Sequence, residues 1–489
     1  MQSNRRCASP ERRRLPRVLV LFAALTLAAA AAAAAAQAQE GRKCTLSVIT
    51  PPGSPSRYVQ LEEGYRLDAW DGVEATCGPS WVRADSATYY EASGVLYLYR
   101  NVEYRDDRRT LVADSAVYYR DEERVRAQGN VILTDRVSRS TLEGPVIDYF
   151  PLSEERPVER IFAPERSHLR LYPDTTPGAE PFEVDADRIH LYGDSLMAGS
   201  GDAVAVRGEL SAYGDSLHLD LGNDELWLLG DPLVEAEDVS LEGDTILVLL
   251  DEGSVEEIQA WPSGAADGRD MFVAARMLRV FVSGEEVERL VAWPGTNPPP
   301  IDSMPPGPWA RAETADYILV GDSIDVERPL GILERVIAVG RARSEATEAA
   351  DPLDPLLGTD WMDGDTIVGF FGLGDSLGEH SSGSDSAPSS EETTELLRLV
   401  ALGSARALYH AVDEKAAGEA TGGRPGINYV LGNVVTIWFK DSKVVEVEVI
   451  GPGTGVYLEP IPPATNGDST VVQEDTASAA SASAKGSER

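Results

Sequence analysis

The chain has 489 residues and a formal net charge of −38, from 81 acidic and 43 basic side chains. Such an acidic excess argues against a nucleic-acid partner, because binding to phosphates needs a basic surface. With three cysteines and five scattered histidines, we predict neither a metal site nor a cofactor.

Residues 1–38 have the pattern of a secretion signal. An arginine-rich start precedes an apolar run from Val18 to Ala36, and Ala36-Gln37-Ala38 fits the small-x-small cleavage motif. The alternative is a transmembrane anchor, since the apolar run is long for a signal core. The weak hydrophobicity of alanine and the position of the motif favour cleavage near Ala38 and export.

Residues 39–80 form a Pro/Gly-rich lead-in, with short strands predicted at Leu46–Ile49 and Tyr65–Trp70. Cys44 and Cys77 are the cysteines that remain after cleavage at Ala38. In an oxidising compartment two such cysteines usually pair, and we expect a disulfide that stabilises by roughly 3–4 kcal/mol. Two free thiols are the alternative.

A repeated β-hairpin begins near Trp81. Ala84–Tyr90 recurs 29 residues later as Ala113–Tyr119, and each copy is followed by a second β-rich run, Gly94–Tyr99 and Arg124–Leu133. Paired β-rich runs joined by short polar links are typical of hairpins. A fixed period of this length predicts a stacked array, with roughly ten units between Trp81 and Glu459.

Shorter traces of the unit continue along the chain. A Gly-Asp-(Ser/Thr)-(Leu/Ile) motif recurs at Gly193–Leu196, Gly214–Leu217, Gly243–Ile246, Gly321–Ile324 and Gly364–Ile367. We interpret these motifs as turns that precede strands, because Gly and Asp are turn formers. Loop-rich segments divide the array into blocks at 81–181, 182–344 and 345–459; the last contains a low-complexity insertion at 372–394. Residues 460–489 are predicted to be disordered.

The Gly-Asp-Ser-Leu tetrapeptides superficially match a serine-hydrolase motif. In that class the motif occurs once, near the start of an α/β enzyme with a paired Asp and His near its end. Here it recurs, Thr replaces Ser in two copies, and helical signal is negligible. The sequence therefore predicts no catalytic residues, and we expect that the protein is not an enzyme.

The unit resembles the OstA-like family of lipopolysaccharide-transport proteins, which includes LptA and the N-terminal domain of LptD. The resemblance depends on the succession of Ala113–Tyr119, Val125–Leu133 and Leu142–Tyr149. It is good over about 81–150 and weaker but periodic to about 459. The chain departs from the family in its length, its acidity and its loops.

The resemblance implies an all-β fold, a twisted β-jellyroll of stacked hairpins whose apolar groove holds acyl chains. Lipopolysaccharide or a related envelope lipid would be the cargo. The partners would be other jellyroll components of a transport bridge, with end-to-end self-association as a further implied property. The location would be the periplasm, with association with the outer membrane as one alternative. Residues predicted to line the groove are Val117, Tyr119, Val131, Leu133, Leu142, Ile147 and Tyr149.

A second hypothesis remains open at this stage. Several strands are apolar on both faces, among them Thr245–Leu250 and Val434–Phe439. Such strands suit either an apolar groove or a filled core. A filled core would indicate a secreted structural or adhesive β-solenoid without lipid cargo.

Overall fold

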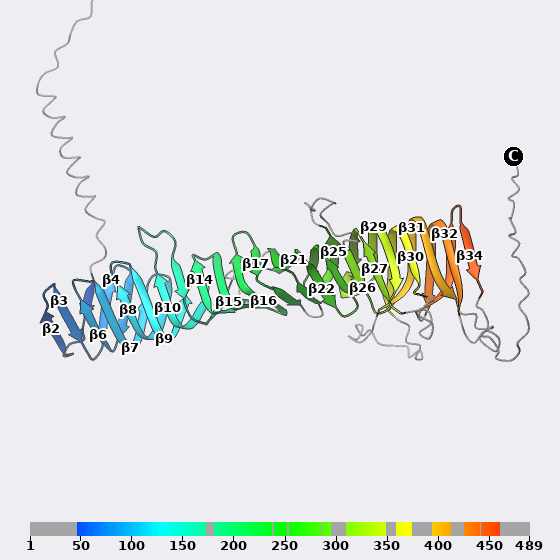
Figure 1. Ribbon diagram of the computed structural model, residues 1–489. Coiled ribbons are helices and arrows are strands. Elements are labelled where there is room, and N and C mark those ends of the chain that lie inside the picture. The colour runs from blue at the N-terminus through cyan, green and yellow to red at the C-terminus, as the bar shows by residue number, and fades with distance from the viewer. Residues whose placement is uncertain are drawn as a thin grey trace, which may run out of the picture. The chain divides into compact units, whose positions relative to one another are not determined.

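The computed structural model describes residues 46–172, 180–236, 239–251, 254–284, 286–294, 310–348, 358–373, 394–411, 425–440 and 442–459. The predicted signal (1–38) and tail (460–489), and most of the insertion (372–394), lie outside these residues. The described chain is built of antiparallel β-strands, with a short 3₁₀ turn, η2 (Pro329–Gly331) (Figure 1). In this part of the chain no helix is long and apolar enough to span a bilayer. The predicted all-β, jellyroll-like class is confirmed.

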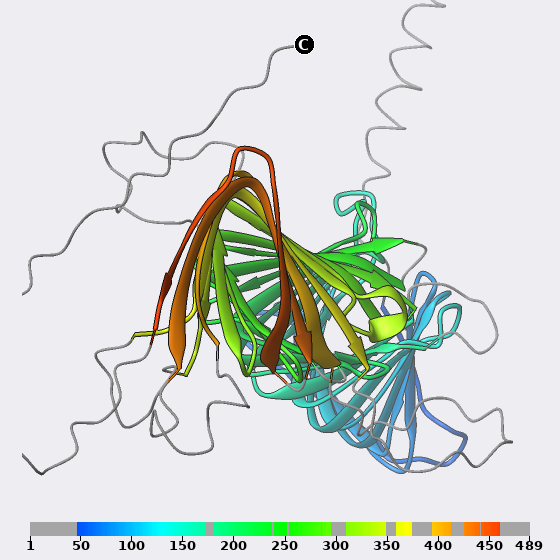
Figure 2. The same cartoon turned by 90° about the vertical axis from the view of Figure 1, so that its right-hand side faces the viewer.

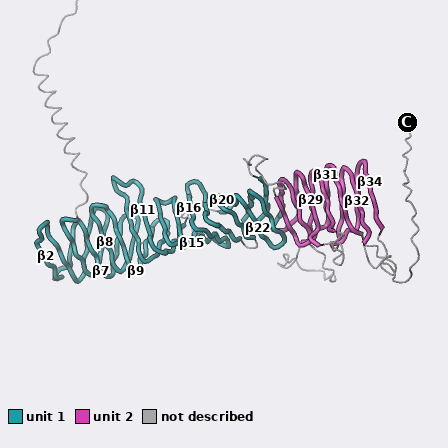
Figure 3. The backbone as a smooth tube through the Cα atoms, in the orientation of Figure 1, with its two compact units in different colours: residues 1–298, 328–331 teal, residues 299–327, 332–489 magenta. Residues whose placement is uncertain are grey.

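The chain divides into two compact units, 1–298 with 328–331 and 299–327 with 332–489 (Figure 3). The strands of unit 1 are β1 (Ser47–Ile49), β2 (Ser56–Gln60), β3 (Tyr65–Ala69), β4 (Val73–Cys77), β5 (Ser80–Ala84), β6 (Ser86–Tyr90), β7 (Val95–Arg105), β8 (Arg109–Tyr119), β9 (Arg124–Asp135), β10 (Thr141–Phe150), β11 (Arg160–Ala163), β12 (Ser167–Leu171), β13 (Phe182–Ala186), β14 (Arg188–Tyr192), β15 (Leu196–Arg207), β16 (Leu210–Asp220), β17 (Glu225–Leu229), β18 (Leu233–Ala236), β19 (Val239–Glu242), β20 (Thr245–Asp251), β21 (Ser254–Trp261), β22 (Gly264–Gly268), β23 (Phe272–Ala275), β24 (Met277–Ser283) and β25 (Glu286–Trp293).

The strands of unit 2 are β26 (Ala310–Glu313), β27 (Tyr317–Gly321), β28 (Ser323–Glu327), β29 (Arg335–Ala346), β30 (Trp361–Leu373), β31 (Thr394–Ala411), β32 (Gly426–Lys440), β33 (Lys443–Ile450) and β34 (Thr454–Leu458). β30 and β31 pair with each other on either side of the low-complexity insertion, as the sequence predicted. Both strands predicted in the lead-in are also present, as β1 and β3.

The pairing of unit 1 defines two layers that share their long strands. Layer A contains β6, the N-terminal half of β7, the C-terminal half of β8, the N-terminal half of β9, the C-terminal half of β10, β11, β14 and the N-terminal half of β15. Layer B contains β4, β5, the other halves of β7 to β10, β12, β13 and the C-terminal half of β15. Each long strand thus crosses from one layer to the other.

Unit 2 repeats this arrangement. The N-terminal half of β29 pairs with β28 and its C-terminal half with β27. Figure 2 shows the strands of unit 2, in yellow to red, diverging from a shared edge into two layers. Tyr317 and Phe439, at the far ends of β27 and β32, meet with ring centroids 5.3 Å apart.

The corner between the layers explains the Gly-Asp motif. β9 bulges at Gly129 and Asn130, both with positive φ, and Asn130 Nδ2 donates to Asp114 Oδ2 at 2.9 Å on the neighbouring strand. The same placement, a positive-φ glycine packed against an Asp of the preceding strand segment, recurs at Gly201/Asp187, Gly230/Asp215, Gly340/Asp322 and Gly403/Asp365. Such bulges bend a strand and increase its twist.

This finding corrects one prediction. Gly214-Asp215-Ser216 lies inside β16 and Gly364-Asp365-Thr366 lies inside β30, so neither is a turn between strands. They mark the point where the strand changes layer. Gly193-Asp194-Ser195 does form the turn between β14 and β15, as predicted.

Candidate functional site

Five of the seven residues predicted to line the groove lie between the layers of unit 1, each at most 2% exposed: Val131, Leu133, Leu142, Ile147 and Tyr149. Val117 and Tyr119 lie on the outward face of β8. The inward face of the same segment carries the buried residues Ala116 and Tyr118. Side chains alternate along a strand, so the residues predicted from β8 lie on its outward face, whereas those predicted from β9 and β10 lie on the inward face. Contact with lipid remains a prediction for all seven.

An apolar cavity of about 220 Å³ lies between the two layers. Its walls include Leu133, Leu142 and Leu169 from layer B and Ile161, Leu191 and Met197 from layer A. Arg108, Arg109, Asp135 and Asp194 form a charged part of the wall. The volume exceeds that of an engineered apolar cavity of about 150 Å³ that binds benzene, so a hydrocarbon segment fits it.

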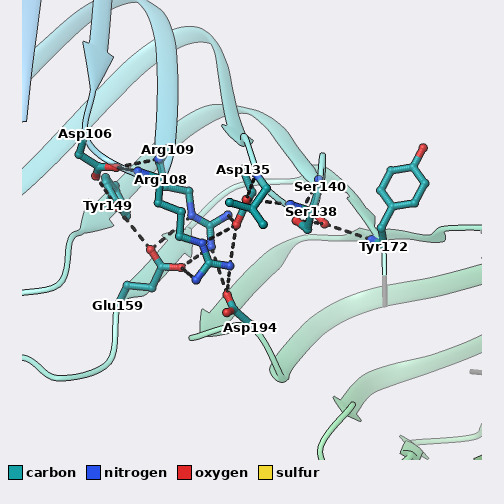
Figure 4. A network of polar contacts seen from close by, with 11 residues as sticks. Asp106, Arg108, Arg109, Asp135, Ser138, Ser140, Tyr149, Glu159, Tyr172 and Asp194 are labelled. Atoms are coloured by element: carbon teal, nitrogen blue, oxygen red, sulfur yellow. Dashed lines mark hydrogen bonds and ion pairs between the residues drawn. The ribbon is translucent and has the colours of Figure 1, made fainter. Parts of the chain in front are cut away.

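The buried centre of this charged wall is Arg109, at the end of β8 in layer B (Figure 4). Its Nη1 lies 3.2 Å from Asp135 Oδ2, and its guanidinium also pairs with Glu159, with Nε donating to Oε2 at 3.3 Å. Asp135 and Glu159 are 1% and 2% exposed. Because Glu159 immediately precedes β11 in layer A, the Arg109–Glu159 pair joins the two layers.

Arg108 makes a second connection between the layers. Its Nη2 lies 2.7 Å from Asp135 Oδ2 within layer B, and it also pairs with Asp194. Asp194 occupies the β14–β15 turn of layer A, and its side chain is 60% exposed, against 30% for Arg108. This outer pair is therefore hydrated, unlike the Arg109–Glu159 pair.

Tyr149 makes the third connection. Its hydroxyl donates to Asp106 Oδ2 at 2.7 Å, from layer A to the β7–β8 turn of layer B, and lies 3.3 Å from Glu159 Oε2. Burial, reinforced by the nearby Asp106 carboxylate, raises the pKa of Tyr149, so the phenol stays protonated and donates. Asp106 Oδ1 also accepts the backbone N–H groups of Arg108 and Arg109, at 2.8 and 2.7 Å, which fixes the turn. We call Asp106, Arg108, Arg109, Asp135, Tyr149, Glu159 and Asp194 the interlayer network.

Asp135 is held ionised within this network. Burial alone would raise its pKa, but Arg109, the backbone N–H groups of Ser138 and Val137, and Arg108 outweigh that effect and lower the pKa below its ordinary value. The two N–H groups donate to Asp135 Oδ1 at 3.0 and 2.7 Å. The carboxylate is thus satisfied largely by groups of its own layer.

A neighbouring contact involves the predicted disulfide. Cys77 is disulfide-bonded and accepts a hydrogen bond from the Tyr118 hydroxyl at 3.2 Å. Burial raises the pKa of Tyr118 to about 12. Cys44 lies outside the described residues, so its pairing with Cys77 remains a prediction.

The interlayer network was not predicted from the sequence, although a signal was present. Every second residue of these strands points inward, as Leu111, Leu133 and Ile161 do. The next inward positions, two residues away, are Arg109, Asp135 and Glu159. A charged residue at an inward position at a strand end is unusual, because burial of an unpaired charge is costly. Three such positions at or next to the ends of separate strands indicate mutual pairing.

The region that contains this site matches a known family. Residues 81–254 match the family described as LptA/(LptD N-terminal domain) LPS transport protein. None of the curated proteins compared with the chain matches it. The match includes the whole interlayer network and the repeats on which the resemblance was based. Over residues 81–254 the chain is therefore similar to the LptA/LptD N-terminal family of lipopolysaccharide-transport proteins, as its motifs predicted.

Proposed function

We propose that the protein is a periplasmic component of lipopolysaccharide transport that holds acyl chains between the layers of its β-jellyroll. The observation that carries this proposal is the apolar cavity between layers A and B, within the region similar to the transport family. The role is one of binding and transfer, with no catalytic step.

Acyl burial supplies the affinity. Burying one methylene is worth about 0.8 kcal/mol, so a fourteen-carbon chain gains on the order of 10 kcal/mol. A lipid with several chains would leave such a site for water extremely slowly. It can move to an adjacent site of the same chemistry at little net cost, which suits an array of repeated hairpins.

The acidic exterior favours an arrangement in which the lipid head groups remain outside the layers. A net charge of −38 does not attract lipid phosphates. The partners in this role are other jellyroll components of the transport bridge, and end-to-end self-association is a further part of the proposal. Export depends on the predicted signal at residues 1–38.

Photo-crosslinking tests the proposal with matched positions. Leu111 and Leu133 are buried between the layers, and their neighbours Val112 and Ile132 are 43% and 37% exposed on the outer face. A photoreactive residue at Leu111 or Leu133 should capture lipopolysaccharide in cells, and one at Val112 or Ile132 should not. Equal capture at both faces, or none at the inner positions, contradicts acyl binding between the layers.

One observation favours the second hypothesis, an exported structural scaffold. Leu96, Leu111, Ile147 and many other inward side chains are almost completely buried by their neighbours. A packed interior admits lipid only if the layers separate. The inner positions of the same experiment distinguish the two functions, since a scaffold would yield no lipid adduct at any of them.

A further inference from the structure

We propose that the interlayer network is a gate that controls access to the apolar cavity, by holding layers A and B together where it joins them. The identity of what enters rests on the proposed function; the gate itself does not. The network and the cavity share Arg108, Arg109, Asp135 and Asp194. The cavity reaches the surface beside the exposed Val137 and Leu196, and separation of the layers at this point would open its inner wall, where Leu169 is buried.

The network also separates two cavities. The second, of about 170 Å³, is lined by Asp106, Arg108, Tyr149 and Glu159 together with Cys77 and Tyr118. Arg108 contributes to the walls of both. A chain that passes along the interior from one cavity to the other would have to pass these side chains.

The choice of residues supports a reversible contact. The buried core ends two residues short of the charged positions, at Leu111, Leu133 and Ile161. Apolar residues in place of Arg109, Asp135 and Glu159 would simply extend this core. Replacing a buried ion pair by well-packed apolar residues is often neutral or stabilising. Charges at this position therefore add little stability that an apolar contact would not, but they can be hydrated when the layers part.

The division of charge between the layers makes opening feasible. Layer B carries Asp106, Arg108, Arg109 and Asp135, two cations and two anions that remain together. Layer A carries Glu159 and Asp194, and Asp194 is already largely in water. Opening thus leaves a neutral set on one layer and hydrated carboxylates on the other, instead of an isolated buried charge.

Thiol accessibility tests the gate without lipid. Leu169 lines the cavity and is 1% exposed, so Leu169→Cys reports on opening through its rate of reaction with a maleimide. Two gate variants are made in this background, R108Q, which breaks the outer pair, and R109M/E159Q, which replaces the inner pair. The control is R170M/E183Q, because Arg170 and Glu183 pair at 2.7 Å within layer B.

We expect R108Q to react roughly tenfold faster than the Leu169→Cys background, equivalent to about 1.4 kcal/mol in the opening equilibrium. R109M/E159Q should also react faster, because Met and Gln do not pack as a matched apolar pair would and do not restore the hydrogen bonds between the layers. The control should be unchanged. Equal rates in all variants overturn the gate. If R109M/E159Q does not fold, as judged by circular dichroism, R108Q decides the question, since the Asp194 carboxylate is exposed and still has Arg109 Nη2 at 3.8 Å.

A second measurement separates the gate from the transport role. Purified lipopolysaccharide is offered to the same gate variants with the photoreactive residue at Leu133, and the rate of capture is compared with that of the protein without gate substitutions. Faster capture in the gate variants supports both proposals. Faster thiol reaction with no capture by any variant supports the gate and contradicts acyl binding. Unchanged thiol reaction contradicts the gate, whatever the capture.

Discussion

Glu159→Ala tests whether the inner pair of the network holds the two layers together. The substitution removes the layer A partner of Arg109 from a site where both side chains are less than a tenth exposed. Removing one member of a buried ion pair costs about 3–5 kcal/mol, because the other charge stays buried and unpaired. Arg109 retains Asp135 at 3.2 Å, so we expect the lower end of this range, about 3 kcal/mol.

The loss of stability should be confined to unit 1, so the assay must measure the stability of unit 1 separately from that of unit 2. Native-state hydrogen exchange in increasing urea, followed on peptides from residues 109–135, gives the opening free energy of β8 and β9. Glu183→Ala is the matched control. Its carboxylate is 40% exposed and pairs with Arg170 within one layer, so we expect a change of about 0–1 kcal/mol.

The pair can also be tested for coupling. R109M/E159Q removes both charges, and we expect it to be less destabilised than Glu159→Ala, since no unpaired charge remains. A cost for Glu159→Ala no greater than that for Glu183→Ala would contradict a role of Glu159 in joining the layers. A double variant as unstable as the single one would contradict it as well, because the loss would then not come from an unpaired Arg109.

Three further predictions concern the corner between the layers, the pH dependence of stability at Asp135 and the disulfide. In urea unfolding, Gly129→Ala should destabilise unit 1 by more than Gly78→Ala. Both glycines have positive φ, but a Cβ at Gly129 would lie 2.5 Å from Asp114 Oδ2, whereas a Cβ at Gly78 would meet nothing within 4 Å. Equal effects would show that the corner tolerates the Cβ. Because the pKa of Asp135 is lowered in the folded state, its ionised carboxylate stabilises the fold fully above the unfolded-state pKa of about 3.9, and this stabilisation is lost as the pH falls through the folded-state pKa. The difference in unfolding free energy between the natural protein and Asp135→Asn should therefore be constant from pH 8 to 5 and shrink below about pH 4. A gap that shrinks already between pH 8 and 5 would contradict this. Cys77→Ser should lower stability by roughly 3–4 kcal/mol if the partner is Cys44, and Cys44→Ser should match it; unequal losses would indicate a different pairing.

The hairpin array was predictable because its signal is local. β-Branched and aromatic runs separated by polar links specify strands from a few residues at a time, and β1, β3 and the pairing of β30 with β31 follow from them. Alternation was also sufficient for the N-terminal half of β9, where Val125 and Ala127 alternate with Arg124, Arg126 and Gln128. In the C-terminal half of β8, Ala116 to Tyr119 are apolar on both faces, so alternation could not indicate which face is buried.

The corner and the network depended on contacts that the sequence does not place side by side. The role of Asp114 is visible only once Gly129 of the next strand bulges against it. Arg109, Glu159 and Asp194 are brought together only when β8, β11 and the β14–β15 turn occupy facing layers. Their meeting depends on the crossing of strands between layers, a property of the whole unit rather than of any one repeat.

The packed interior sets a condition on lipid transport. A chain that enters between the layers must displace contacts among inward side chains such as Leu133 and Ile161, and each Å² of apolar lining exposed costs about 25 cal/mol. An acyl chain restores a similar area, so the net cost is set by the contacts that the chain cannot replace. Those are the polar contacts of the interlayer network. If lipid does enter, the barrier should therefore depend on the charges at Arg108, Arg109 and Glu159 more than on the size of the apolar residues around the cavity, and conservative changes such as Leu169→Met should affect capture less than R108Q.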